Sequence, residues 1–105
     1  MISEYVLFDL PVGISREKVV KDMEDIAPHW RKNPDLIRKT FLYDAGKNQG
    51  GALYTWHNRE AADKAHDAAW RQRLMETYGT EPTIRYFETP LIAGNALEAI
   101  VVENK

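Results

Sequence analysis

Residues 50–90 read GGALYTWHNREAADKAHDAAWRQRLMETYGTEPTIRYFETP, and this stretch decides the fold. Residues 51–56 are rich in β-forming side chains and predict a strand. Asn58 is a suitable N-cap for an amphipathic helix that continues to about Tyr78. Residues 83–89 again have the composition of a strand. The stretch therefore predicts a strand, a helix and a second strand.

The same kinds of element precede this stretch. Residues 2–10 alternate apolar side chains and predict a strand. Apolar side chains at helical spacing after Ser15, a suitable N-cap, predict a helix from about residue 16 to residue 27 or slightly beyond. Pro28 lacks a backbone donor and is expected to kink or end this helix. Leu36–Asp44 predict another strand, which a short polar loop joins to the next one. The order β-α-β-β-α-β predicts an α+β, ferredoxin-like fold.

Apolar side chains occupy both faces of several predicted strands. Tyr5 and Leu7 lie opposite the apolar face of the first strand. Two helices cover one face of a four-stranded sheet, so the other face would expose a large apolar area. We therefore expect a homodimer in which two sheets pack face to face. The apolar extension 91–105 is expected to add a short strand or turn to a single domain, 1–105, with its core in 2–90.

Composition excludes several classes of protein. The chain has 105 residues, a net charge of −2 and no cysteine. It therefore has no basic field for nucleic acid or anionic lipid, and no thiolate for catalysis or metal binding. The N-terminus lacks the features of a signal peptide, and no apolar run could cross a bilayer, so we expect a cytoplasmic protein. The three histidines have no metal-ligand spacing, and no phosphate-binding glycine motif occurs.

Three segments carry a resemblance to a known family: PDLIRKTFLYD (34–44), GGALYTWHNREAADKAHDAAW (50–70) and YGTEPTIRYFETP (78–90). They resemble the small monooxygenase-like proteins of the dimeric α+β barrel superfamily, which holds the antibiotic-biosynthesis monooxygenases. The resemblance covers about residues 2–90. It implies a homodimeric barrel, a pocket between sheet and helices, and oxidation of aromatic molecules without metal or flavin.

The superfamily also includes haem-degrading enzymes, isomerases and proteins without known activity. The haem-degrading members resemble a pattern with an asparagine on the first strand, which is absent here. Their helical tryptophan position falls on Ala65. The resemblance therefore does not imply haem degradation.

His66 and Trp70 are the central candidates for chemistry because they are one helical turn apart on an alanine-rich face. His66 could be a general base beside the aromatic wall of Trp70. The alternative is a core histidine that bonds to the backbone.

The other candidates are one charge and four aromatic side chains. Arg38 could stabilise a phenolate or enolate, although a salt bridge to Glu88 is the alternative. Substrate contacts are predicted for four residues, each of which could instead serve packing: Trp56, Tyr86, Tyr54 and Tyr43.

Two functional hypotheses follow. The first is a cofactor-independent monooxygenase, in which a small aromatic or quinol-like substrate is deprotonated in the pocket and its carbanion reacts with oxygen. The second is a small-molecule-binding or stress-related homodimer without catalysis. An open cavity that reaches His66 would favour the enzyme, whereas a sealed His66 would favour the binding protein.

Overall fold

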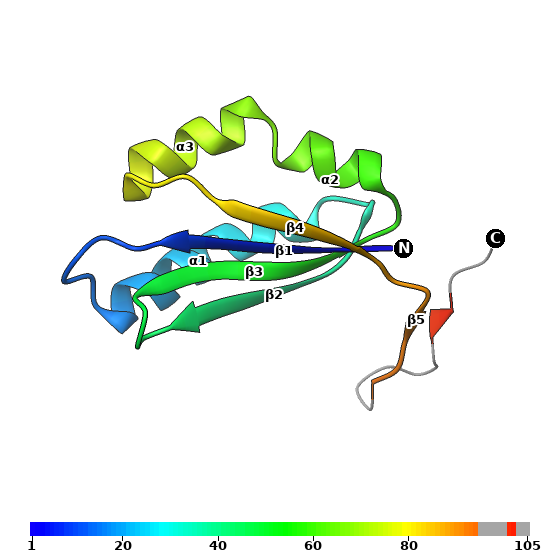
Figure 1. The fold of residues 1–105 in the computed structure, drawn as a ribbon, viewed down its shortest axis with the longest axis horizontal. Helices are drawn as coiled ribbons and strands as arrows, with labels where there is room; N and C mark the ends of the chain where they lie inside the picture. The colour runs from blue at the N-terminus through cyan, green and yellow to red at the C-terminus, as the bar shows by residue number, and fades with distance from the viewer. Residues whose placement is uncertain (95–100, 103–105) are drawn as a thin grey trace.

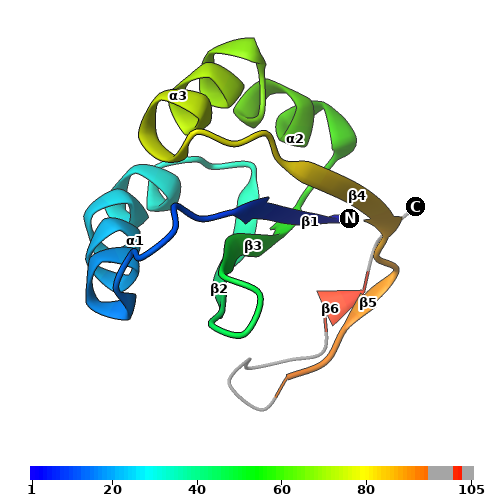
Figure 2. The ribbon, with the colours of Figure 1, turned by 60° about the vertical axis from the view of Figure 1, so that its left-hand side comes forward.

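The computed structural model describes residues 1–94 and 101–102. The elements follow one another as β1 (Ile2–Asp9), α1 (Arg16–Arg31), β2 (Leu36–Asp44), β3 (Gln49–Trp56), α2 (Arg59–Ala65), α3 (Ala68–Tyr78), β4 (Thr83–Glu88), β5 (Leu91–Ile92) and β6 (Val101–Val102) (Figure 1). Strands β1 to β4 form one antiparallel sheet in the order β2-β3-β1-β4. The helices lie on one side of this sheet (Figure 2). The arrangement confirms the α+β, ferredoxin-like prediction.

The predicted helix caps are confirmed by their backbone contacts. Ser15 accepts a hydrogen bond from the backbone N–H of Lys18, and Asn58 accepts one from Ala61. Gly79 follows α3 with a φ of 70°, a left-handed conformation that glycine adopts without strain. Short polar side chains and one glycine thus set the helix ends from local sequence alone.

One prediction about the helices is wrong. The first helix ends slightly beyond residue 27, as predicted, but Pro28 does not end it: it continues to Arg31, because Trp30 is 6% exposed and holds the last turn in the core. The second helix, predicted to be continuous, is broken into α2 and α3. His66 has φ −109° and ψ 52°, which ends α2. The side chain of Asp67 then caps α3 by accepting a hydrogen bond from the backbone N–H of Trp70. No helix in the described residues is long and apolar enough to cross a membrane.

A β-bulge determines which side chains of β2 face the helices. The pairing of β2 with β3 shifts between Leu36 and Arg38. Lys39 consequently lies opposite Tyr54, on the inner face, while Arg38 is exposed on the outer face. Strict alternation would have placed Leu36 and Arg38 on the same face of β2. Because of the bulge they lie on opposite faces, and Leu36 packs against the core.

The predicted C-terminal extension contains a short hairpin. Leu91–Ile92 pair antiparallel with Val101–Val102, and this hairpin extends away from the helices (Figure 2). Residues 95–100 and 103–105 of the extension lie outside the described residues. The expected short strand is therefore present at β5 and β6.

The backbone of β1 leaves no room for a side chain at Gly51. A Cβ atom there would collide with the carbonyl oxygen of Val6 on β1. We expect Gly51→Ala to lower the free energy of unfolding by about 1–3 kcal/mol, because a packed sheet resists added atoms. Gly46→Ala is the matched control, since its Cβ would meet only Asp44 Oδ1 at 3.5 Å. Urea unfolding checks this, and equal midpoints for the two variants would contradict it.

Candidate functional site

A cavity of about 610 Å³ lies between the sheet and the helices. Its wall comes from the inner face of β1, β2 and β3 and from facing sides of α1 and α3. Most of the lining is apolar or aromatic, with a few charged groups. The aromatic lining residues are Phe8, Trp30, Phe41, Tyr54, Trp70 and Tyr78. This size and composition are typical of a site for a small aromatic molecule.

Lys39 is the cation that the sheet directs into this cavity. Its Nζ lies 4.1 Å from the centre of the Trp30 ring, 4.2 Å from Phe41 and 4.8 Å from Tyr54. These rings attract the ammonium through their π faces, but they desolvate it. Burial lowers the pKa of Lys39 to about 7. Near neutral pH the group can therefore either accept a proton or carry a positive charge.

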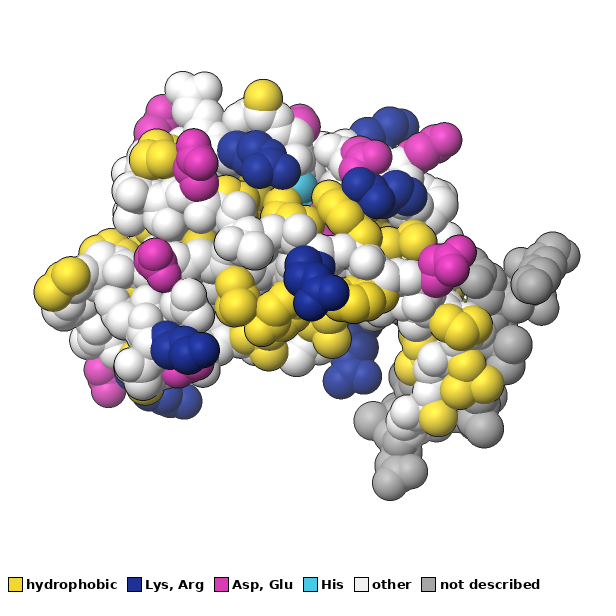
Figure 3. Space-filling model, in the orientation of Figure 1, with side chains coloured by type: hydrophobic (Ala, Val, Ile, Leu, Met, Phe, Trp, Pro, Cys, Tyr) yellow, Lys and Arg dark blue, Asp and Glu magenta, His cyan; other side chains and the backbone are white. Residues whose placement is uncertain are grey.

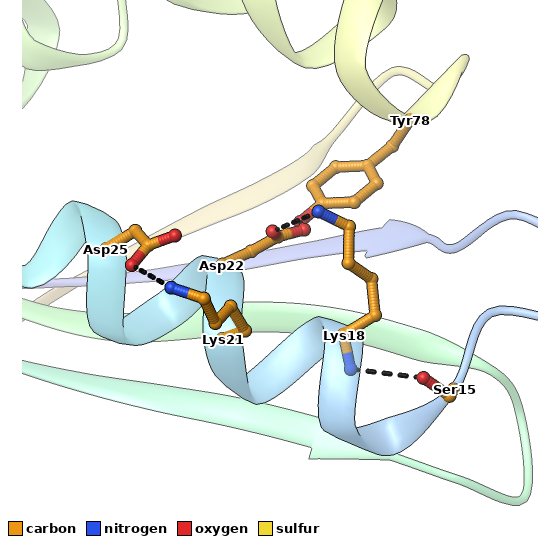
Figure 4. A network of polar contacts seen from close by, with 6 residues as sticks. All are labelled: Ser15, Lys18, Lys21, Asp22, Asp25 and Tyr78. Carbon is orange, nitrogen blue, oxygen red and sulfur yellow. Dashed lines mark hydrogen bonds and ion pairs between the residues drawn. The ribbon is translucent and has the colours of Figure 1, made fainter.

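The carboxylates that line the same cavity are already paired elsewhere. Asp22 contacts Lys18 Nζ at 2.8 Å and accepts a hydrogen bond of 2.7 Å from the Tyr78 hydroxyl (Figure 4). Asp25 pairs with Lys21 at 2.9 Å. Among the described residues no carboxylate forms an ion pair with Lys39. An anionic ligand would thus supply the partner that is absent from this part of the chain.

The contact between Asp22 and Tyr78 also joins α1 to the end of α3. Both residues line the cavity, so the contact fixes one end of it. Burial and the neighbouring Asp22 carboxylate raise the pKa of Tyr78, which keeps the phenol protonated as the donor.

A second polar cluster lies behind the aromatic wall. Glu4 is fully buried on β1, and its Oε1 accepts a hydrogen bond of 2.9 Å from Trp56 Nε1. Nδ1 of His66 lies 2.8 Å from the same oxygen, in an ion-pair contact whose geometry is not that of a hydrogen bond. Oε2 of Glu4 and Nε2 of His66 have no hydrogen-bond partner among the described residues. The cluster is therefore held by electrostatic contact and packing.

His66 does not line the cavity. Its side chain is 0% exposed, and its ring is packed against Trp70 at 4.3 Å and Tyr54 at 4.6 Å between ring centres. Both of these rings line the cavity, so His66 lies directly behind its wall. The broken helix thus keeps His66 and Trp70 together, as the sequence predicts, but it turns the imidazole away from the cavity and towards Glu4.

The other predicted site residues divide between the cavity and its surroundings. Tyr54 and Trp70 line the cavity, whereas Trp56 is buried behind it with Glu4. Tyr86 lies beside Glu4 on β4 and is covered by Arg59, whose Cζ is 3.4 Å from the ring centre.

Tyr43 and Arg38 lie outside the cavity lining. Tyr43 is opposite Gly50, and Arg38 is on the outer face. The neighbouring Lys39 occupies the place in the cavity that was expected for Arg38. Within the described residues no group of three histidine, aspartate or glutamate side chains could hold a metal ion.

Glu4 and Lys39 are the residues that sequence reasoning missed. Glu4 interrupts an otherwise apolar strand face formed by Ile2, Val6 and Phe8, and this was the available signal for a buried carboxylate. Lys39 lies on the same predicted strand face as Phe41 and Tyr43, so the sequence allowed its side chain to point inward. The bulge that makes Lys39 part of the cavity has no signal in the sequence.

No family model matches the chain, and no curated protein sequence matches it. Solved structures do match. The monooxygenase ActVA-Orf6 of Streptomyces coelicolor, solved with nanaomycin D, is 17% identical with a TM-score of 0.63, and the match covers 93% of this chain and 92% of that one. A provisionally assigned antibiotic biosynthesis monooxygenase from Deinococcus radiodurans is 15% identical with a TM-score of 0.61, over 94% and 98% of the two chains.

A third match is Rv0793 from Mycobacterium tuberculosis, at 9% identity and a TM-score of 0.62, over 91% and 100% of the two chains. The chain has the fold of the antibiotic-biosynthesis monooxygenase-like structures. This confirms the resemblance at the level of the fold. At 9–17% identity the monooxygenase-like fold carries no residue roles with it, so chemistry has to be argued from the cavity.

Proposed function

We propose that this protein is a cofactor-independent monooxygenase that binds a small phenol or quinol in the cavity. One observation carries the proposal: Lys39, which has no carboxylate partner within residues 1–94, lies in an aromatic cavity of about 610 Å³. Its ammonium would pair with the ionised oxygen of the substrate, and the rings around it would hold the substrate plane. The monooxygenase-like fold supports this choice among aromatic ligands.

The chemistry can be written with this chain's own groups. Neutral Lys39 accepts the phenolic proton, and the resulting phenolate carries carbanion character at a ring carbon. That carbon donates one electron to O₂. The substrate radical and superoxide then combine through a new C–O bond, which gives a peroxide on the ring. The Lys39 ammonium returns its proton to the outer peroxide oxygen, the O–O bond breaks, and loss of the ring C–H proton releases water. A phenol and O₂ thus give a quinone and water.

Binding without catalysis is the second candidate function, and a specific observation favours it. The side chain of His66 is sealed, so the base predicted from the sequence does not open onto the cavity. In that case the cavity would bind an aromatic molecule, and the cluster of His66 and Glu4 would serve only the core. Oxygen consumption separates the candidates, because a binding protein would bind phenols and quinols without consuming O₂.

The pH dependence of binding tests the role of Lys39 in either function. The probe is 2-naphthoate, an aromatic anion. When it is bound it stabilises the Lys39 ammonium, so it raises the pKa of Lys39 above the value of about 7 in the free protein. Binding then takes up a proton above pH 7, and we expect affinity to fall by up to about tenfold per pH unit between about pH 7 and pH 9. Titration calorimetry measures this directly.

Other charged groups line the cavity and require controls. Asp25 and His29 come from α1, and Arg73 comes from α3. We expect His29→Asn to retain the fall in affinity and Lys39→Met to lose it. A fall that persists in Lys39→Met would contradict the assignment.

We also propose that the outer sheet face forms a homodimer. No helix of the described residues lies over this face, and hydrophobic side chains gather there over the strands (Figures 2 and 3). Leu53 is 39% exposed and Phe87 is 44% exposed, with Tyr5 and Leu7 beside them on β1. An apolar sheet face of this kind is stabilised by a second copy.

Light scattering tests the dimer. We expect a mass of twice the 12.1 kDa of the chain, and a monomer mass for the double variant Leu53→Glu/Phe87→Glu. Val12→Glu is the control, because Val12 is fully exposed on the loop between β1 and α1 and lies away from this face. A wild-type mass near that of one chain at micromolar concentration would contradict the proposal.

A further inference from the structure

Lys39 has the surroundings of a nucleophilic amine as well as those of a counter-ion. Its Nζ is enclosed by Trp30, Phe41 and Tyr54 in an apolar cavity. The carboxylates of that cavity, Asp22 and Asp25, are held by other partners. No ion pair among the described residues therefore holds the lysine in its charged form. Desolvated lysines without a carboxylate partner are the ones that attack carbonyl groups in proteins.

We infer that the cavity is also a carbonyl-binding site, in which Lys39 condenses with an aromatic aldehyde to form an imine. The amine lone pair attacks the carbonyl carbon, a C–N bond forms, and a proton moves from nitrogen to oxygen to give a carbinolamine. The hydroxyl then leaves as water as the C=N bond forms, so amine and aldehyde give imine and one water. The step needs no oxidant, and it goes beyond the proposed oxygenation.

Tyr54 is placed to assist the loss of water. It lies directly opposite Lys39 in the pairing of β2 with β3, with its ring centre 4.8 Å from Nζ. Burial, with a smaller effect of the Glu4 carboxylate, raises the pKa of Tyr54, so its phenol stays protonated at neutral pH. It would therefore act as a hydrogen-bond donor to the carbinolamine oxygen, while the proton lost from nitrogen goes to the departing hydroxyl.

The cavity also selects the kind of aldehyde. Trp30 and Phe41 offer flat apolar surfaces around the amine, and Trp70 adds another to the cavity wall, which suits an uncharged aromatic ring. An exposed lysine such as Lys47 offers no such wall. Burial also lowers the pKa of Lys39 to about 7, whereas an ordinary lysine is neutral at that pH in only about one molecule in a thousand or fewer.

Reductive trapping tests the inference. The purified protein is incubated anaerobically at about pH 7 with 2-naphthaldehyde, reduced with borohydride and analysed by intact mass and peptide mapping. We expect one adduct per chain, located at Lys39 and formed on the order of a hundredfold faster than at any exposed lysine. Naphthalene, which matches the ring system of the aldehyde but has no carbonyl, should compete for the cavity and slow this labelling.

Two conservative variants complete the design. Lys39→Arg keeps the charge but lacks a neutral amine, so it should lose the adduct, whereas Lys47→Arg should keep it. Far-UV circular dichroism confirms that both are folded. Adducts spread evenly over the lysines, or an undiminished adduct in Lys39→Arg, would overturn the inference. Because no oxygen is present, failure of the oxygenase proposal cannot produce or hide the result.

Discussion

Lys39→Met is expected to reduce substrate-dependent oxygen uptake by about 10²- to 10⁴-fold, the usual effect of removing a general base. Methionine fills a similar volume among Trp30, Phe41 and Tyr54, but it can neither accept the phenolic proton nor balance a phenolate. The measurement is an oxygen-electrode assay over a panel of phenols and quinols, with the quinone product followed by absorbance.

Lys39→Arg separates the two roles of the side chain. Arginine stays protonated, so it should still bind an aromatic anion but should lose turnover with a neutral phenol. Lys47→Met is the matched control, since Lys47 is exposed in the loop between β2 and β3, and it should retain full activity. Wild-type turnover in folded Lys39→Met would contradict the proposed mechanism. Oxygen uptake that is absent from the wild-type protein itself, with phenol binding retained, would favour the binding function.

Periodicity and capping carry the fold from the sequence. Strands β1 to β4 follow alternating side chains, and Ser15 and Asn58 mark the starts of α1 and α2 through local hydrogen bonds. Such signals act over a few residues and do not depend on distant contacts. The sheet order then follows from the few ways in which this series of elements can pack.

The errors have a tertiary origin. Pro28 was expected to kink or end the first helix, but it does not end it, because burial of Trp30 outweighs the loss of one backbone hydrogen bond. At the break between α2 and α3, His66 contacts a carboxylate, Glu4, that lies 62 positions earlier in the chain. Local sequence cannot report a contact of that kind. Aspartate is, however, a residue type that favours the N-cap position, so Asp67 was an available signal for the start of α3.

The same limit applied to the candidate site. Arg38 and Lys39 are neighbours on a strand, so their side chains point to opposite faces of the sheet. Alternation alone did not decide which of the two points inward. The bulge after Leu36 and the rings that enclose Nζ decide between them. A single step in register thus moves a cation between the outer face of the sheet and the cavity.

Glu4→Leu is expected to lower the free energy of unfolding by about 3–5 kcal/mol, because it removes one partner from a fully buried polar cluster. The change leaves the indole N–H of Trp56 without its acceptor and His66 without its ion-pair contact. Each lost contact of this kind costs far more in the interior than at the surface. Glu88→Leu is the matched control, since Glu88 is exposed on β4 and should change stability little.

The double variant Glu4→Leu/His66→Leu decides what the cluster does. If the two side chains stabilise each other, the double variant should be more stable than the sum of the single effects predicts, since neither the carboxylate nor the imidazole is left buried without the other. Urea unfolding of the four proteins measures this coupling. We expect His66→Leu to retain turnover per folded molecule, because the imidazole is sealed behind Tyr54 and Trp70 and Lys39 supplies the base. A His66→Leu protein with unchanged stability but no turnover would instead return the role of base to His66, and it would require the Trp70 wall to open during catalysis.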